Sequence, residues 1–454
     1  MTPARSKFLF AALLLVWTGR TVLSAQAGPP NILFIMVDDM GYADAGCYGQ
    51  KVIPTPNLDR LAAEGTRFTQ VYAGSPVCAP SRSVLMTGLH TGHTTVRGNT
   101  GIGGVPGLDG TQGRVPLKAE DRTVAEYLKE LGYTTGMTGK WGLGEPGTEG
   151  EPNRQGFDEW FGFLNQGRAH HHFPEYLWHN TERKELEGNR GGEGPHYAHD
   201  LFTGFATDFI RRHADGARPF FLYLPYTLPH DKYQIPSTDP FTEKPWTGDE
   251  KVHAAMIARI DRDIGSLMRL LQERGVAENT VVFFCSDNGA ARRWEGRFDS
   301  SGPLRGRKRD LYEGGIRVPM IVRWPGVVPK GAVSEAPWYF PDVLPTLVAI
   351  AGGKPPEGID GINVLPALKG DAQAELCERH LYWEFFEGGY KQAARRGQWK
   401  VVRPALEAAL ELYHLGRDPS EQRNIAGEHP EVIEQFEAYL KAARTPSEHW
   451  PLGR

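Results

Sequence analysis

The chain has 454 residues, which is long enough for one large and one smaller domain. Its residues are 40% hydrophobic and 23% charged, the proportions of an ordinary globular protein. Its formal net charge of −4 at pH 7 argues against a nucleic-acid binder or a general polyanion binder, because such proteins are usually basic. A small anionic ligand is not excluded, since a few converging cations can bind an anion in any protein.

The N-terminus has the features of a secretory signal peptide, which we predict to cover residues 1–27. Arg5 and Lys7 precede a short apolar run from Phe8 to Trp17, and Ala25-Gln26-Ala27 matches the small-x-small pattern that signal peptidases cut. The run is shorter than the ~20 residues that span a bilayer, and no later stretch is apolar enough to do so. We expect an exported protein, periplasmic or secreted, without a membrane span in its mature form. An uncleaved anchor is the alternative.

The main part of the chain alternates between strand and helix patterns. The apolar run from Asn31 to Asp39 is typical of a buried parallel strand that ends in two acids. A long helix is predicted from Asp249 to Gly275, directly before the strand-like run TVVFFCSDNG. This alternation predicts an α/β fold with a large, mostly parallel sheet between two layers of helices. Ligands of such folds gather outside the carboxyl ends of the strands.

The pattern changes beyond about Gly370. LYWEFFEGG, QAARRGQWKVVR and LELYHLG are typical of short antiparallel strands, and EVIEQFEAYLKAAR of a closing helix. We therefore predict a main domain over residues 28–370 and a smaller α+β domain with a short antiparallel sheet over residues 371–454.

Four cysteines are present, at positions 47, 78, 285 and 377. Their number and spacing do not resemble a dense disulfide framework. We expect Cys285 and Cys377 to be buried, inert thiols.

The most specific segment is CAPSRSVLMTG, from Cys78 to Gly88. It resembles the signature of the type I sulfatases, in the alkaline phosphatase superfamily, with Cys78 and Arg82 in the positions of that motif. The resemblance implies that a transient maturation enzyme oxidises Cys78 to formylglycine, whose hydrate attacks sulfur with one hydroxyl and expels sulfate with the other. The predicted helix start at this segment also favours an anion, through its free amides and dipole.

The resemblance covers nearly the whole mature chain. GYTTGMTGKWGLG resembles the second sulfatase signature and places Lys140 on its sulfate-binding lysine. The commoner pattern has a histidine, a candidate base for sulfate release, where this chain has Gly142. His230 matches the histidine that protonates the leaving oxygen, a role that suits imidazole chemistry. Lys308 matches a second substrate lysine.

A metal site is predicted from acids at strand ends. Asp38, Asp39, Asp287 and Asn288 offer only oxygen ligands, which suits calcium with its six to eight oxygens better than zinc. The resemblance also implies calcium, with the formylglycine made from Cys78 as a further metal ligand.

A histidine cluster, RAHHHFP, follows further along the chain and resembles an active-site loop of the family. His170 matches it best as a substrate-binding residue, and it is also our candidate for the base that Gly142 leaves unassigned. Surface histidines are the alternative.

Together these observations predict an arylsulfatase-like hydrolase of sulfate monoesters, acting on a sulfated carbohydrate or an aryl sulfate. The first alternative is a phosphonate or phosphate-diester hydrolase of the same superfamily. The second is a catalytically inactive protein that binds sulfated glycans, an alternative that Gly142 in place of the family histidine would favour.

Overall fold

The computed structural model describes residues 28–294 and 296–452. The predicted signal peptide, residues 1–27, lies outside this part of the chain. Within the described residues, no helix is both long and apolar enough to cross a membrane.

Strand β1 (Asn31–Val37) lies in the middle of the main sheet and is buried along its whole length. Its residues alternate between two hydrophobic cores, with Ile32, Phe34 and Met36 in one and Leu33 and Ile35 in the other. An apolar strand without polar alternation is therefore buried on both faces, as its sequence predicts.

The sheet in the described part of the chain has eleven strands, in the order β10-β2-β9-β8-β1-β7-β3-β4-β5-β6, with β11 paired to β2. The central neighbours β8, β1, β7, β3 and β4 run parallel, whereas β9, β5 and β6 pair antiparallel with their neighbours. The remaining bounds are β2 Thr66–Tyr72, β3 Thr134–Lys140, β4 Glu159–Phe163, β5 Tyr176–His179, β6 Glu182–Glu185, β7 Phe220–Pro225, β8 Thr280–Ser286, β9 Arg317–Arg323, β10 Ala332–Ser334 and β11 Trp338–Tyr339.

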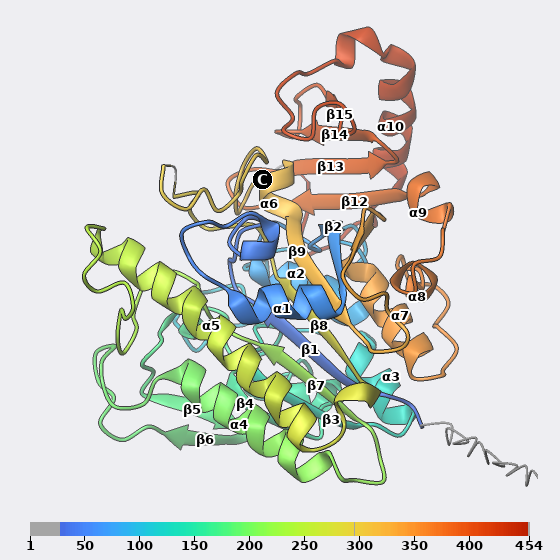
Figure 1. Ribbon diagram of the computed structural model, residues 1–454. Coiled ribbons are helices and arrows are strands. Elements are labelled where there is room, and N and C mark those ends of the chain that lie inside the picture. The colour runs from blue at the N-terminus through green and yellow to red at the C-terminus, as the bar shows by residue number, and fades with distance from the viewer. Residues whose placement is uncertain (1–27, 295, 453–454) are drawn as a thin grey trace, which may run out of the picture.

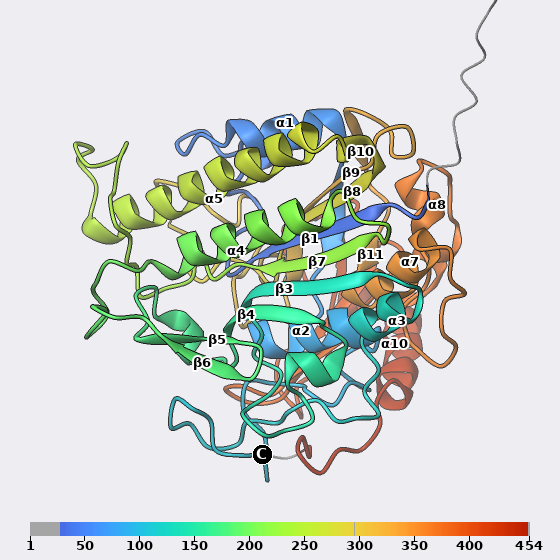
Figure 2. The same ribbon diagram turned by 90° about the horizontal axis from the view of Figure 1, so that it is seen from below.

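Helices cover both faces of this sheet (Figure 2). One layer contains α1 (Pro56–Glu64), α4 (Ala198–His213) and α5 (Gly248–Glu273). The opposite layer contains α2 (Cys78–Thr87), α3 (Val124–Glu130) and α7 (Val343–Ile350). Short helices lie at α6 (Glu313–Ile316), α8 (Leu365–Leu368) and α9 (Glu375–Glu378).

Local sequence explains where several helices begin and end. Helix α5 starts with a capping box in which Thr247 and Glu250 satisfy each other's backbone amides, and α3 starts with the equivalent pair Thr123 and Glu126. Helix α1 ends at Gly65, and the chain turns directly into β2.

A second, antiparallel sheet of four strands stands above the main sheet (Figure 1). Its strands are β12 (His380–Phe385), β13 (Lys391–Arg396), β14 (Trp399–Arg403) and β15 (Glu411–His414), and helix α10 (Pro430–Ala442) packs against it. The predicted α/β class with a smaller antiparallel sheet near the C-terminus is confirmed.

A buried group of charges, the Lys400 cluster, links the small sheet to the main one. The Lys400 ammonium lies 2.9 Å from Glu313 Oε1 and 2.8 Å from Glu421 Oε1. Glu313, at the start of α6, also accepts hydrogen bonds from Tyr72 and Arg317. Burial acts to raise the pKa of Glu313, but Lys400 and Arg317 outweigh it and lower this pKa to about 2.

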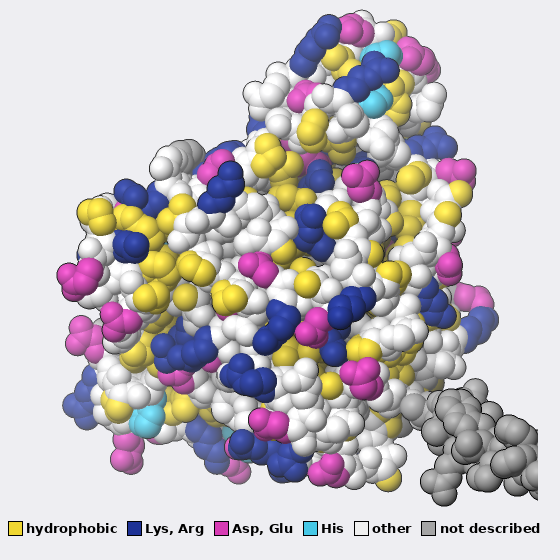
Figure 3. All heavy atoms as spheres, in the orientation of Figure 1, with side chains coloured by type: hydrophobic (Ala, Val, Ile, Leu, Met, Phe, Trp, Pro, Cys, Tyr) yellow, Lys and Arg dark blue, Asp and Glu magenta, His cyan; other side chains and the backbone are white. Residues whose placement is uncertain are grey.

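The surface shown in Figure 3 carries basic and acidic side chains interspersed with one another. This face offers no broad basic region, in agreement with the net charge of −4.

The described cysteines form no disulfide bond. Cys285 is buried on β8, as predicted, but the prediction that Cys377 is buried is wrong. Cys377 lies on the short helix α9 between the two sheets, where the chain runs over the surface, and it is exposed.

Candidate active site

Four neighbouring parallel strands bring the predicted residues to one edge of the main sheet. Asp38 and Asp39 follow β1, and Asp287 and Asn288 follow β8. Lys140 is the last residue of β3, which lies beyond β7 in the sheet. Since parallel strands end at the same edge, residues that are far apart in sequence meet there.

Asp38 has no exposed surface. One of its oxygens accepts a hydrogen bond of 2.6 Å from Lys140 Nζ and lies 3.5 Å from the Arg82 guanidinium. The other oxygen lies 3.3 Å from Cys78 Sγ. Burial acts to raise the pKa of Asp38, but Lys140, His230 and Arg82 together hold this pKa well below its usual value.

Cys78 is the first residue of α2, whose ten residues are all buried. Arg82 follows one helical turn later, so both side chains lie on the same face of the helix. Arg82 donates to Asp287 Oδ2 at 2.8 and 3.2 Å and to the Lys140 carbonyl at 2.7 Å. The arginine thus fixes the helix start against the ends of β8 and β3. Burial and the nearby carboxylates of Asp38 and Asp39 outweigh Arg82 and raise the pKa of Asp287 to about 6.

Asp39 has a left-handed backbone, with φ of 68°, an uncommon conformation for a residue other than glycine. Its carboxylate accepts hydrogen bonds of 2.7 Å from Asn288 Nδ2 and from Lys308 Nζ. Asn288 Oδ1 is buried and has no hydrogen-bond partner among the described residues. A buried acceptor without a partner is costly, so this oxygen is suited to bind a cation or a hydrogen-bond donor.

Asp38, Asp39, Cys78 and His230 each offer a ligand atom, and these atoms lie within 4.8 Å of one another. His230 was not among the predicted metal ligands, whereas Asp287 and Asn288 were. Asp287 Oδ1 lies 3.2 Å from the Asp39 amide, so it lies beside the same cluster.

His230 lies between the acids and the pocket. Its Nδ1 lies 2.6 Å from Asp231 Oδ1, and its Nε2 lies 3.2 Å from Lys308 Nζ and 3.5 Å from Asp39 Oδ2. Burial and Lys308 lower the pKa of His230, but Asp39, Asp38 and Asp231 outweigh them and raise it to about 10. Its ring stacks on that of His170 with centroids 3.9 Å apart.

These residues open onto a pocket of about 610 Å³, here called the Cys78 pocket. Cys78, His170, His230 and Lys308 line it. The loop after β12 adds Glu387 and Gly388, so the small sheet contributes to the rim.

Sequence reasoning missed Gln166, which lines the same pocket and is almost fully buried. Gly142 has φ of 77°, and a Cβ added there would lie 2.3 Å from Gln166 Oε1. Gln166 therefore fills the space that a side chain at position 142 would need. Its Oε1 has no hydrogen-bond partner among the described residues. The glycine at position 142 is the only sequence signal for this arrangement, and it does not say which side chain fills the space.

The structure thus brings every predicted site residue to one place. The buried group comprises Asp38, Asp39, Cys78, Arg82, Lys140, Asp287 and Asn288, with His170, His230 and Lys308 along the pocket wall. An oxygen-rich cleft between cations, with a nucleophilic side chain at a helix start, can hold and attack a tetrahedral oxyanion.

Comparisons with known proteins agree with this geometry. The sulfatase family model matches residues 30–353, and a model of the N-sulphoglucosamine sulphohydrolase C-terminal region matches residues 306–445. The chain is 33% identical to N-acetylgalactosamine-6-sulfatase of Canis lupus familiaris, over 97% of this chain and 85% of the relative. It is 34% identical to human arylsulfatase A, over 90% and 87% of the two chains.

Among solved structures, Ps i-CgsB in complex with k-i-k-neocarrahexaose superposes with a TM-score of 0.81 and 29% identity, covering 94% of this chain and 95% of the other. The phosphonate monoester hydrolase of Agrobacterium radiobacter shares the fold, with a TM-score of 0.66 at 20% identity, over 91% and 95% of the chains. The family match over most of the chain, together with the cluster around Cys78, establishes that this protein belongs to the type I sulfatases of the alkaline phosphatase superfamily.

Proposed function

We propose that this enzyme hydrolyses sulfate monoesters of carbohydrates with a formylglycine made from Cys78 and a bound calcium ion. The observation that carries the proposal is the position of Cys78 at the start of α2, with Sγ 3.3 Å from Asp38 and facing a cation-lined pocket. In the matured enzyme, hydroxyl oxygens of the formylglycine hydrate would stand where Sγ lies.

The donor set fits calcium. Asp38, Asp39, Asp287 and Asn288 supply oxygens from two adjacent strand ends, and Asn288 Oδ1 is the buried acceptor that lacks a partner. Calcium, when bound, supplies positive charge beside the sulfate and the nucleophile. Asp38, Asp39 and Asp287 carry three negative charges, and Arg82, Lys140 and Lys308 beside them carry three positive charges. A bound Ca²⁺ would therefore leave this group at about +2, which favours an anionic ester.

The pocket cations are placed to bind the sulfate group. Lys308 lines the pocket and lies 2.7 Å from Asp39, while Lys140 is buried behind it, 2.6 Å from Asp38. Both aspartates hold the ammonium groups in fixed positions, so the lysines need no rearrangement as charge develops on the transferring group.

His230 is placed to protonate the leaving oxygen. Because Asp231 lies 2.6 Å from Nδ1, this N–H donates a hydrogen bond to the carboxylate, and Nε2 faces Lys308 and the pocket. The role itself comes from the family motif that His230 matches.

For sulfate release we propose His170 as the base, because residue 142 offers none. His170 lines the pocket, stacks on His230, and has a buried Nε2 without a hydrogen-bond partner among the described residues. Gln166 fills the space beside Gly142, but an amide does not titrate, so it can orient a hydroxyl and not remove its proton.

The substrate class is supported by the names of similar proteins. They include an N-acetylgalactosamine-6-sulfatase and a protein solved with neocarrahexaose, at 33% and 29% identity. We further propose that the protein is exported, that a maturation enzyme oxidises Cys78, and that residues 28–370 and 371–454 form separate domains.

The decisive experiment combines mass spectrometry with activity. The Cys78 peptide of purified active enzyme should be lighter than its thiol form, and sulfate should be released from sulfated sugars. Active enzyme that contains only the thiol would contradict the mechanism. A higher kcat/KM on phosphate diesters than on sulfate esters would support the diesterase alternative, and tight binding without release would support a glycan-binding role.

A further inference from the structure

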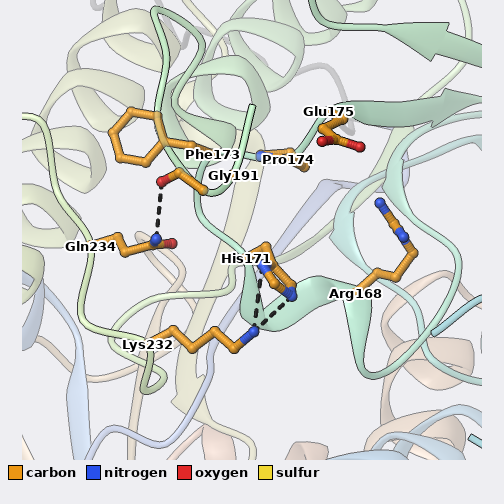
Figure 4. A pocket seen from close by; sticks show the side chains of 9 residues that line it. Arg168, His171, Phe173, Pro174, Glu175, Gly191, Lys232 and Gln234 are labelled. Atoms are coloured by element: carbon orange, nitrogen blue, oxygen red, sulfur yellow. Dashed lines mark hydrogen bonds between the residues drawn. The ribbon is translucent and has the colours of Figure 1, made fainter. Parts of the chain in front are cut away.

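The structure contains a second hollow, of about 450 Å³ (Figure 4). We call it the Arg168 pocket; Arg168, His171 and Lys232 lie along its walls. Figure 4 shows the Lys232 side chain extending toward the His171 ring, with Arg168 on the opposite side of His171.

The two pockets share their walls. The segment from residue 166 to 171 gives Gln166 and His170 to the Cys78 pocket and Arg168 and His171 to the Arg168 pocket. In the segment from residue 230 to 232, His230 and Asp231 line the Cys78 pocket and Lys232 lines the Arg168 pocket. A ligand held over residue 78 therefore needs to extend only past these two segments to reach the second pocket.

The Arg168 pocket has cations without carboxylate partners. Neither Arg168 nor Lys232 forms an ion pair within the described residues. The Arg168 guanidinium stacks over the Tyr176 ring at 4.3 Å, which leaves its N–H edge for another acceptor. Lys232 Nζ lies 2.7 Å from His171 Nε2, and an ammonium can only donate, so the His171 ring accepts this bond in its neutral form. Among the described residues, Glu175 is the one acid that lines the pocket.

The remaining walls are shaped and held in place. Gln234 donates to the Gly192 carbonyl at 2.9 Å and accepts from the His172 amide at 3.3 Å, which ties the glycine loop to the histidine segment. Gly191 and Gly192 leave the rim without side chains, and their φ of 62° and 87° favours glycine at both positions. Phe173 adds an apolar surface of the kind that packs against a sugar ring.

We propose that the Arg168 pocket binds a second acidic substituent, a sulfate or a carboxylate, on the same saccharide whose sulfate ester lies over residue 78. This inference rests on the proposed function, and it narrows the substrate to a glycan with two or more acidic groups. Arg168 and Lys232 bind the second anion, and the glycine rim lets the sugar backbone pass.

The test compares the two cations across matched substrates. Sulfate release is measured for wild type, Arg168→Gln, Lys232→Gln and the double variant on three disaccharides that carry the same scissile sulfate. One has a neighbouring uronate, one a neighbouring second sulfate, and one is the carboxyl-reduced, neutral form. The kcat/KM ratio of acidic to neutral substrate should fall about 10- to 100-fold with each cation removed, as for other charge-assisted hydrogen bonds. The preferred acidic disaccharide identifies the substituent as carboxylate or sulfate.

Arg183→Gln is the matched control. Arg183 stacks on the same Tyr176 ring at 3.8 Å but does not line the pocket, so its loss should leave the ratio unchanged. A wild-type enzyme without preference for either acidic disaccharide, or variants that lower all three values equally, would overturn the proposal.

A binding measurement separates this proposal from the proposed function. Calorimetry with the Cys78→Ala variant and the three disaccharides needs no turnover. If no substrate releases sulfate but the acidic ones bind more tightly and Arg168→Gln removes the difference, the hydrolase proposal fails and the second pocket stands. Equal affinities for the acidic and neutral disaccharides would contradict the proposed anion binding in the Arg168 pocket, whether or not the enzyme releases sulfate.

Discussion

Two buried groups of charges in this molecule invite comparison, the one around Cys78 and the Lys400 cluster. In both, fully buried lysines meet carboxylates at 2.6 to 2.9 Å. Both groups also contain an acid with a left-handed backbone, Asp39 with φ of 68° and Glu421 with φ of 52°, but only the first group opens onto a large pocket. Buried charge and local backbone strain therefore do not distinguish a functional site from a structural contact between two sheets, whereas an adjoining pocket does.

The largest effect should come from Cys78→Ala, which removes the nucleophile of the first group. Loss of a covalent nucleophile costs on the order of 10⁶-fold in kcat. Unfolding midpoints should stay close to wild type, because the substitution removes only one buried atom. Cys285→Ala is the control, since Cys285 is equally buried but lies outside the pocket, and it should retain turnover. Comparable sulfate release by Cys78→Ala would remove Cys78 from the mechanism.

The next largest effect concerns sulfate release. His170→Ala should slow this step by ~10²–10⁴-fold and let the sulfated enzyme accumulate, while the initial burst of alcohol product persists. Pre-steady-state kinetics measures both phases. A change confined to KM would make His170 a recognition contact instead.

Gly142→His tests the same step from the other side. A histidine there is strained, with φ of 77° and a Cβ 2.3 Å from Gln166 Oε1, so the single variant should lose activity and not gain a base. Gly142→His combined with Gln166→Ala removes that contact and should recover part of the loss. Full activity of the single variant would contradict the packing described here.

In the Lys400 cluster, a substitution should affect stability and not chemistry. Lys400→Met leaves Glu313 and Glu421 buried without their shared cation, which costs about 3–5 kcal/mol for broken buried ion pairs. Urea unfolding measures the loss, and kcat per folded molecule should stay unchanged. Lys441→Met, on the exposed face of α10, should change stability by less than about 0.5 kcal/mol. A large fall in kcat for Lys400→Met would place this cluster in the site.

Chelation of calcium should abolish activity, and calcium addition should raise the Tm of the wild type through binding to the folded state.

The smallest effect of a substitution should follow from Asn288→Ala. Asn288→Ala should weaken calcium binding about 10- to 100-fold, as for other groups that hold a metal site, and should shift the calcium titration of both activity and Tm. An unchanged titration would remove Asn288 from the ligands.

The sequence predicted those parts of the fold and site that depend on local pattern. Uniformly apolar strands followed by acids placed Asp38 and Asp287 at one edge of the sheet, because parallel strand ends converge there. Gln166 could not be found in this way, because it meets Gly142 through the path of two loops and no spacing rule links them. The burial of Cys377 was predicted wrongly because no local pattern says whether a residue between two sheets is covered when the sheets pack together.

The enclosure of α2 limits when the proposed oxidation of Cys78 could take place. Cys78 is 1% exposed, and every residue of α2 is buried between the main sheet and its neighbours. Under the proposed maturation, an enzyme would have to reach Cys78 before α2 is enclosed, so oxidation and folding would compete for the newly made chain. Chains that fold first would keep the thiol. A preparation would then contain two folded populations, and its specific activity would report the fraction of chains oxidised before folding.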